Sequence, residues 1–122
     1  MMSSVESIIR ELPPADTNPA EICQRFMELL RSGNRISAEN LLTKTALMTT
    51  TKAELTLEPM GGPASTYEFK NVRYATTKKK LAQVDCVVAE TVEGEEFRME
   101  MTWVVRKQSQ GWRISGVMLE LE

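Results

Sequence analysis

Two glutamates form the one group of acidic side chains that the sequence predicts to act together. Glu90 and Glu120 lie on two predicted strands, and Met99 lies on the strand between them. If the turn between the first two of these strands has four residues, all three side chains share one cross-strand row. Neighbouring carboxylates can raise the pKa of one of the pair, as general acid or base catalysis requires. Such a pair is equally expected where a sheet runs past its covering helix into water, so both interpretations stay open.

The thiols are the other side chains with chemical potential. Cys23 and Cys86 are too few for a disulfide framework and lack the spacing of metal ligands. One is predicted on a helix and the other on the facing sheet, about 10 Å apart, which exceeds the usual reach of a disulfide. We therefore expect both thiols to be buried, reduced and unreactive, and we predict no metal or cofactor.

A closing hairpin positions Met99 and Glu120. Apolar and polar side chains alternate over residues 97–107, stop at the polar residues 108–111 and alternate again from Trp112. If Lys107 faces Trp112, the same hairpin places Val105 opposite Ile114, Trp103 opposite Gly116, and Met101 opposite Met118. A large ring then covers a bare glycine, which makes this register chemically reasonable.

The elements before the hairpin are predicted from residues that cap or end helices and from the periodicity of apolar residues. Residues 1–17 are predicted to form an amphipathic N-terminal helix and a linker, and residues 18–32 a helix capped by Asn18 and ended by Gly33. A further helical segment, with Ser37 as a possible N-cap, is expected to fray at the threonines 49–51. Leu55 and Leu57 suggest a short edge strand.

Two more strands are predicted before the hairpin, over residues 66–74 and 81–92. The apolar phase of the first strand shifts near Lys70, which predicts a β-bulge. Even positions of the second strand then face the helix of residues 18–32, and odd positions face away from it.

The two faces of this predicted sheet give two candidate sites. The face beneath the helix predicts an apolar, methionine-rich pocket lined by Phe26, Cys86, Glu90, Met99, Met101, Trp103, Met118 and Glu120. The outer face predicts an apolar patch with a polar rim, formed by Val87, Val104, Val117 and Leu119. The first fits a small apolar ligand, and the second fits a homodimer that packs sheet to sheet.

These features together resemble the nuclear transport factor 2-like superfamily, whose members have a cystatin-like cone. The resemblance rests on the capped helix that ends at Ser32 and Gly33, the helical residues 38–42, the bulged strand, and the closing pattern of residues 103–106 and 111–114. It is closest to small uncharacterised bacterial members. It implies an α+β fold in which N-terminal helices pack on a curved, four-stranded antiparallel meander.

This superfamily includes enzymes such as ketosteroid isomerase and scytalone dehydratase. None of their catalytic residues can be assigned to a position in this chain. The dehydratase type uses histidine, and the chain has none. The isomerase type needs an aspartate in the pocket, but Asp16 precedes the helix and Asp85 has outer-face parity. We therefore expect a noncatalytic interaction or small-ligand-binding domain of unknown physiological role, with an enzyme that uses the glutamate pair as the alternative.

Composition limits the class of protein and its partners. The chain has 122 residues, 42% of them hydrophobic, and a net charge of -2, which predicts one domain over residues 1–122. Without a basic face, nucleic acid is not an expected partner. No apolar run approaches the length of a membrane span and no signal peptide is evident, so a cytoplasmic location is expected unless a signal has been removed.

Overall fold

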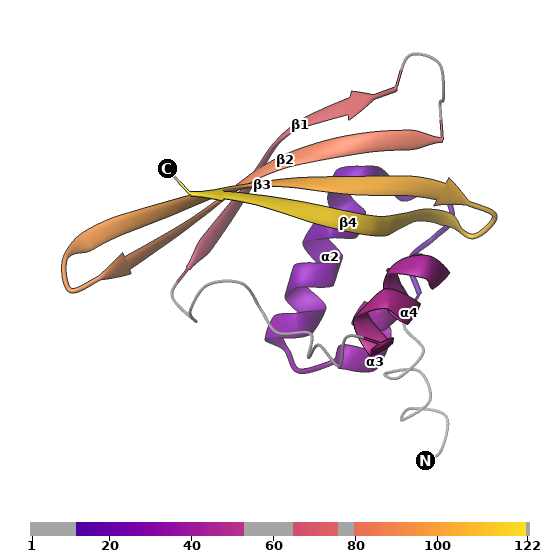
Figure 1. Cartoon of the computed structure of the whole chain (residues 1–122), viewed down its shortest axis with the longest axis horizontal. Helices are drawn as coiled ribbons and strands as arrows, with labels where there is room; N and C mark the ends of the chain where they lie inside the picture. The colour runs from indigo at the N-terminus through magenta and orange to yellow at the C-terminus, as the bar shows by residue number, and fades with distance from the viewer. Residues whose placement is uncertain (1–11, 53–64, 76–79, 122) are drawn as a thin grey trace.

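The computed structural model describes residues 12–52, 65–75 and 80–121, and it confirms the predicted α+β class (Figure 1). In the described part, three helices precede a four-stranded antiparallel sheet of order β1-β2-β3-β4. The helices are α2 (Pro19–Arg31), α3 (Arg35–Glu39) and α4 (Lys44–Lys52). The strands are β1 (Thr66–Tyr74), β2 (Leu81–Val92), β3 (Glu95–Gln108) and β4 (Gly111–Leu121).

Helix α2 has the ends that its sequence predicts. The Asn18 side chain accepts a hydrogen bond from the backbone N–H of Glu21 at 2.9 Å, which satisfies one of the free donors of the first turn. At the other end Gly33 adopts a φ of 81°, and the N–H groups of Gly33 and Asn34 bond back to the carbonyls of Leu30 and Leu29. This pair of bonds is a Schellman motif, and it ends the helix sharply.

The structure divides the next predicted helical segment into two helices, α3 and α4, and their ends differ from the predicted ones. Asn34 caps α3 by accepting a hydrogen bond from the backbone N–H of Ser37, so the prediction of Ser37 as the cap is wrong. The predicted fraying is also wrong, because α4 continues to Lys52. The hydroxyls of Thr50 and Thr51 donate to backbone carbonyls one turn earlier, which accommodates these weak helix formers.

The chain between α3 and α4 is hydrogen-bonded to the sheet. The backbone N–H of Thr43 donates to the carbonyl of Ile114 at 2.8 Å, and the N–H of Ile114 donates to the carbonyl of Leu41 at 2.7 Å. These bonds make a short parallel bridge between Leu42 and Ile114 along β4. The helical layer is thereby attached to the last strand as well as to the sheet face.

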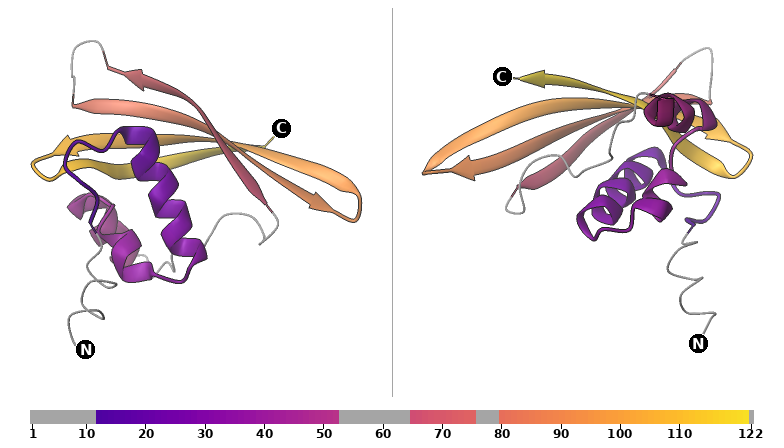
Figure 2. Two further views of the ribbon diagram at one scale, coloured as in Figure 1. Left: turned by 180° about the vertical axis from the view of Figure 1, so that it is seen from behind. Right: turned by 60° about the horizontal axis from the view of Figure 1, so that its bottom comes forward.

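Helix α2 lies across one face of the sheet, which we call the inner face (Figure 2). The Phe26 ring meets the Trp103 ring of β3 edge to face, with centroids 5.8 Å apart and planes at 77°. Around this contact the core gathers further buried side chains from both layers: Ile22, Cys23, Met27, Leu30, Val84, Cys86, Val88, Met101, Val105 and Ile114.

The predicted bulge in β1 is confirmed, because the pairing of β1 with β2 shifts between Phe69 and Val72. A second bulge, in β4, was not predicted. Val105 faces Ile114 as expected, but the next partner of β3 along β4 is Gly116, which faces Val104 and leaves Ser115 as an extra residue. From Gly116 onward, the positions of β4 predicted to face the helix face outward, and those predicted to face outward face the helix.

The reversal corrects two predicted pairs. Trp103 faces Val117 rather than Gly116, and Met101 faces Leu119 rather than Met118. Met118 consequently leaves the inner face, and it is 55% exposed. The pairing of Lys107 with Trp112, nearer the turn, is confirmed.

Two predicted elements, the amphipathic N-terminal helix and the edge strand at Leu55 and Leu57, lie outside the described residues. The division into a linker over residues 1–17 and a cone over 18–122 stays a prediction.

Replacing Trp103 with alanine should lower the free energy of unfolding by about 3 to 5 kcal/mol, the usual cost of deleting a buried aromatic side chain. The matched control is Phe97→Ala, also on β3, because the Phe97 ring is 56% exposed and its loss should cost less than about 1 kcal/mol. Denaturant melts followed by circular dichroism measure both. A similar, small loss for the two variants would show that the Phe26–Trp103 contact does not support the core.

Candidate functional site

The predicted pocket beneath α2 is mostly packed core. Phe26, Cys86, Met101 and Trp103 are each at most 4% exposed, and all four belong to one buried cluster. Met99 is partly buried against the same cluster. A small apolar ligand among these side chains stays a prediction, and it would require the packed residues to separate.

The predicted row of two glutamates around Met99 does not form. The turn between β2 and β3 has two residues, Glu93 and Gly94, and so Glu90 faces Phe97 while Met99 faces Val88. The backbone of Glu120 pairs with Glu100, a position of the opposite parity, and the Glu120 side chain lies outside the described residues. The shorter turn and the β4 bulge each move one carboxylate away, so the prediction of an acidic pair at this place is wrong.

The two thiols lie in the core as predicted. Cys23 and Cys86 are both free and buried. Burial raises the pKa of the Cys86 thiol to about 11, and the backbone of Glu68 and then the Trp103 side chain oppose this shift in part. The indole N–H of Trp103 nevertheless makes no well-aligned hydrogen bond within the described residues. Burial, and then the neighbouring Cys86, raise the pKa of Cys23 still further.

Within the described ranges, no three histidine, cysteine, aspartate or glutamate side chains gather closely enough to hold a metal ion.

The outer face of the sheet, opposite α2, is the larger candidate surface. The described helices all lie on the other side of the sheet (Figure 2). Val87 is only 8% exposed, Val104 is half-buried and Met118 is prominent. The face is hollowed by a depression of about 570 Å³, lined by Lys70, Asn71, Asp85, Cys86, Val87, Glu100, Met101, Thr102 and Met118.

The structure keeps part of the predicted interface and replaces part of it. Val87 and Val104 lie on the outer face as predicted. Val117 does not, because it pairs with Trp103 and packs against the core. Leu119 has the same parity as Val117, and its side chain lies outside the described residues. Met118 takes their place on the outer face, and nothing in the sequence signals this exchange because β4 carries apolar residues at both parities.

A polar bridge connects three strands on this face. Arg73 of β1 donates to the Asp85 carboxylate of β2 at 2.8 Å, and the hydroxyl of Thr102 on β3 donates to the same oxygen at 3.2 Å. Asp85 therefore has two partners within the sheet, which gives it a structural role at the centre of the outer face.

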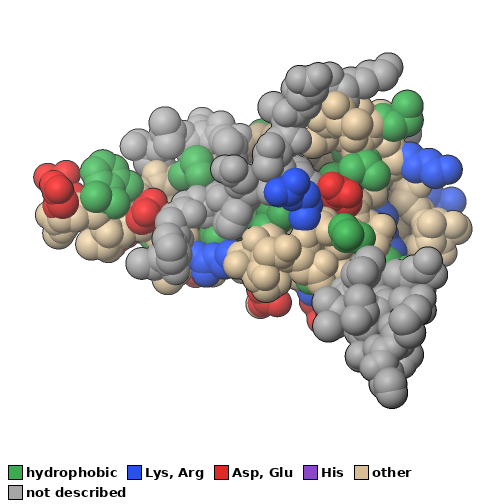
Figure 3. All heavy atoms as spheres, turned by 90° about the horizontal axis from the view of Figure 1, so that it is seen from below, with side chains coloured by type: hydrophobic (Ala, Val, Ile, Leu, Met, Phe, Trp, Pro, Cys, Tyr) green, Lys and Arg blue, Asp and Glu red, His purple; other side chains and the backbone are tan. Residues whose placement is uncertain are grey.

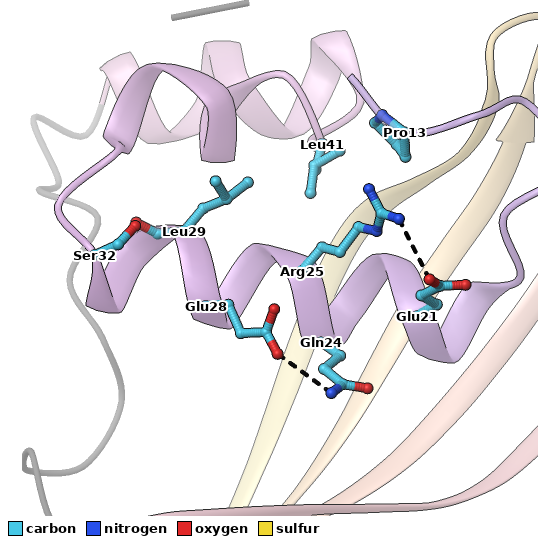
Figure 4. A pocket seen from close by; sticks show the side chains of 8 residues that line it. All are labelled: Pro13, Glu21, Gln24, Arg25, Glu28, Leu29, Ser32 and Leu41. Carbon is cyan, nitrogen blue, oxygen red and sulfur yellow. Dashed lines mark hydrogen bonds and ion pairs between the residues drawn. The ribbon is translucent and has the colours of Figure 1, made fainter. Parts of the chain in front are cut away.

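A second concave surface, a groove of about 500 Å³, runs along the other side of α2 (Figure 4). Leu29 and Leu41 contribute apolar surface to it. Its polar side chains bond to one another: Arg25 to Glu21 at 3.4 Å, and Gln24 to Glu28 at 3.3 Å. This pairing along one helix stabilises α2 and leaves no converging set of polar groups for chemistry.

The comparisons with known proteins bear on the fold. One solved structure that the chain resembles is the CaMKII hub homology domain of Chlamydomonas reinhardtii, with a TM-score of 0.52. The chain is similar in fold to a hub homology domain. The match covers 84% of this chain and 94% of that one at 16% sequence identity, which shows the fold alone. The α+β arrangement is consistent with the predicted nuclear transport factor 2-like fold.

A scan against protein-family models and a search of curated proteins found no match. Within the described ranges, no helix is long and apolar enough to cross a membrane.

Both thiols should resist a maleimide reagent in the native protein at pH 8, because each is buried and its raised pKa keeps it protonated. Mass spectrometry should show less than about one tenth of the labelling rate of the same protein in denaturant, where two thiols react. Rapid labelling of the native chain would contradict the burial, and an intact mass two units low would reveal a disulfide.

Proposed function

We propose that this chain is a noncatalytic interaction domain of the nuclear transport factor 2-like superfamily, and that it pairs with a second copy of itself through the outer face. The observation that carries this proposal is the apolar centre of a sheet face that no described helix covers. Val87, Val104 and Met118 form this centre.

An antiparallel sheet that meets only water on one face usually presents alternating polar residues there. The middle of this outer face carries Val87, Val104 and Met118 together with the bonded pair Asp85 and Thr102, and charged residues surround them: Glu68, Arg98, Glu100 and Arg106. An apolar centre inside a charged rim is the usual composition of a protein interface. Burying it against a second sheet removes the exposed Met118 side chain from water, which is favourable.

The face is large enough for a stable contact. Four strands about 4.8 Å apart, each about ten residues long with a rise of about 3.4 Å per residue, cover a flat area of about 650 Å². The uneven surface of the side chains adds to this area. A standard interface buries about 800 Å² on each partner. The outer face therefore provides most of an ordinary interface without help from other elements.

The likeness in fold to a hub homology domain is compatible with a noncatalytic role. A fold shared at low identity does not itself assign a function. The proposal rests on the composition of the outer face of this chain.

The wild-type protein should elute with about twice the 13.8 kDa chain mass in size exclusion with light scattering at micromolar concentration. Val104→Glu should give the single-chain mass with an unchanged circular dichroism spectrum, because a charge at the apolar centre opposes burial. Val92→Glu is the matched control, since Val92 is 46% exposed at the far turn of β2 and should leave the mass doubled. A wild-type monomer at high concentration would rule the proposal out.

A further inference from the structure

The charges of the outer face are divided between its two halves. Each row of this face consists of residues paired across the strands. The row that contains Val87 also holds the carboxylates Glu68 and Glu100. Two rows away in one direction lies Glu96, which pairs with Arg98 at 3.4 Å. Carboxylates thus predominate in the half of the outer face nearest the β2–β3 turn.

Guanidinium groups predominate in the other half. Arg73 lies in the row of Val104, beside Gln83, and Arg106 follows in the next row; the neighbour of Arg106 on β4, Arg113, is buried. Asp85 lies one row nearer the acidic half, in the row of Thr102, and its carboxylate is bonded to Arg73. Figure 3 views the molecule from below, on the side of the helices; it shows acidic side chains at the end formed by the β2–β3 turn, basic ones at the opposite end, and both kinds between them.

Two symmetric ways of packing this face on itself differ in which rows meet. A two-fold axis parallel to the strands leaves every row opposite the same row of the second copy, so carboxylates meet carboxylates and guanidiniums meet guanidiniums. A two-fold axis that runs across the strands reverses the order of the rows, so the acidic half meets the basic half. Like charges across an interface are strongly unfavourable, and opposite charges select the partner and its orientation.

We propose that two copies pack outer face to outer face about an axis across the strands, with Arg106 of each copy opposite Glu100 of the other. This inference rests on the proposed pairing through the outer face and adds the orientation of the partner. The axis passes between the rows of Thr102 and Val104, and it places those two residues opposite each other at the centre. Arg106 and Glu100 each lie three residues from that axis.

The distances permit this contact. Three residues of a strand span about 10 Å. Packed sheets are usually rotated by about 30°, which displaces two positions 10 Å from the axis by about 5 Å. The side chains of arginine and glutamate can extend over that displacement. Both Arg106 and Glu100 are exposed in the single chain.

Charge exchange tests this orientation. Arg106→Glu and Glu100→Arg should each raise the dimer dissociation constant at least tenfold, which corresponds to about 1.4 kcal/mol of binding free energy. The two-fold axis makes each new like-charge contact occur twice in the dimer. The double variant, Arg106→Glu with Glu100→Arg, restores opposite charges at both places and should return the constant to within about threefold of wild type. Sedimentation equilibrium at low and at physiological salt measures all four proteins.

The matched control is Lys107→Glu, which makes the same change of charge one residue from Arg106 on the opposite parity of β3. It should change the dissociation constant by less than about threefold. A wild-type dimer whose double variant stays as weak as the single variants would overturn the orientation and leave the face-to-face pairing standing. A monomeric wild type would overturn both, and circular dichroism of each variant separates either result from unfolding.

Discussion

The contact between Phe26 and Trp103 joins the helical layer to the sheet, and the arrangement of the rest of the domain depends on it. Trp103 sits in the middle of β3, flanked by Val84 and Val117, so its ring occupies the centre of the inner face. Its buried N–H lacks a well-aligned acceptor within the described residues, a cost of about 1 to 3 kcal/mol that the packing of two large rings must outweigh. A core filled in this way serves stability, and the outer face is left without a covering helix among the described residues.

Two bulges determine which side chains that outer face presents. In β1 the shift between Phe69 and Val72 keeps aromatic and apolar residues on the inner face on both sides of the bulge. In β4 the extra residue, Ser115, turns Val117 inward and Met118 outward. One inserted residue per strand thus sorts the apolar side chains between the core and the surface, and the composition of the surface follows from backbone geometry as much as from residue type.

The sequence predicted those features whose signals are local. The ends of α2 were correct because Asn18 and Gly33 act on the backbone within one turn, and the β1 bulge was visible as a change of apolar phase at Lys70. The β4 bulge left no such trace, since Val117 and Met118 satisfy either parity. The turn at Glu93 and Gly94 could hold two residues or four, and that one ambiguity misplaced Glu90. The separation of charge on the outer face was also missed, because it appears only when residues distant in the chain are arranged in rows.

The bridge between Leu42 and Ile114 has a consequence for the behaviour of the protein at high concentration. A free edge strand offers its unpaired backbone groups to any extended chain nearby, and this is how many β proteins start to form fibres. Here the segment of residues 41–43 already bonds to both backbone groups of Ile114, so the part of β4 nearest its turn is closed to such growth. The connection that positions α3 and α4 therefore also covers this part of the edge and opposes the addition of another strand there.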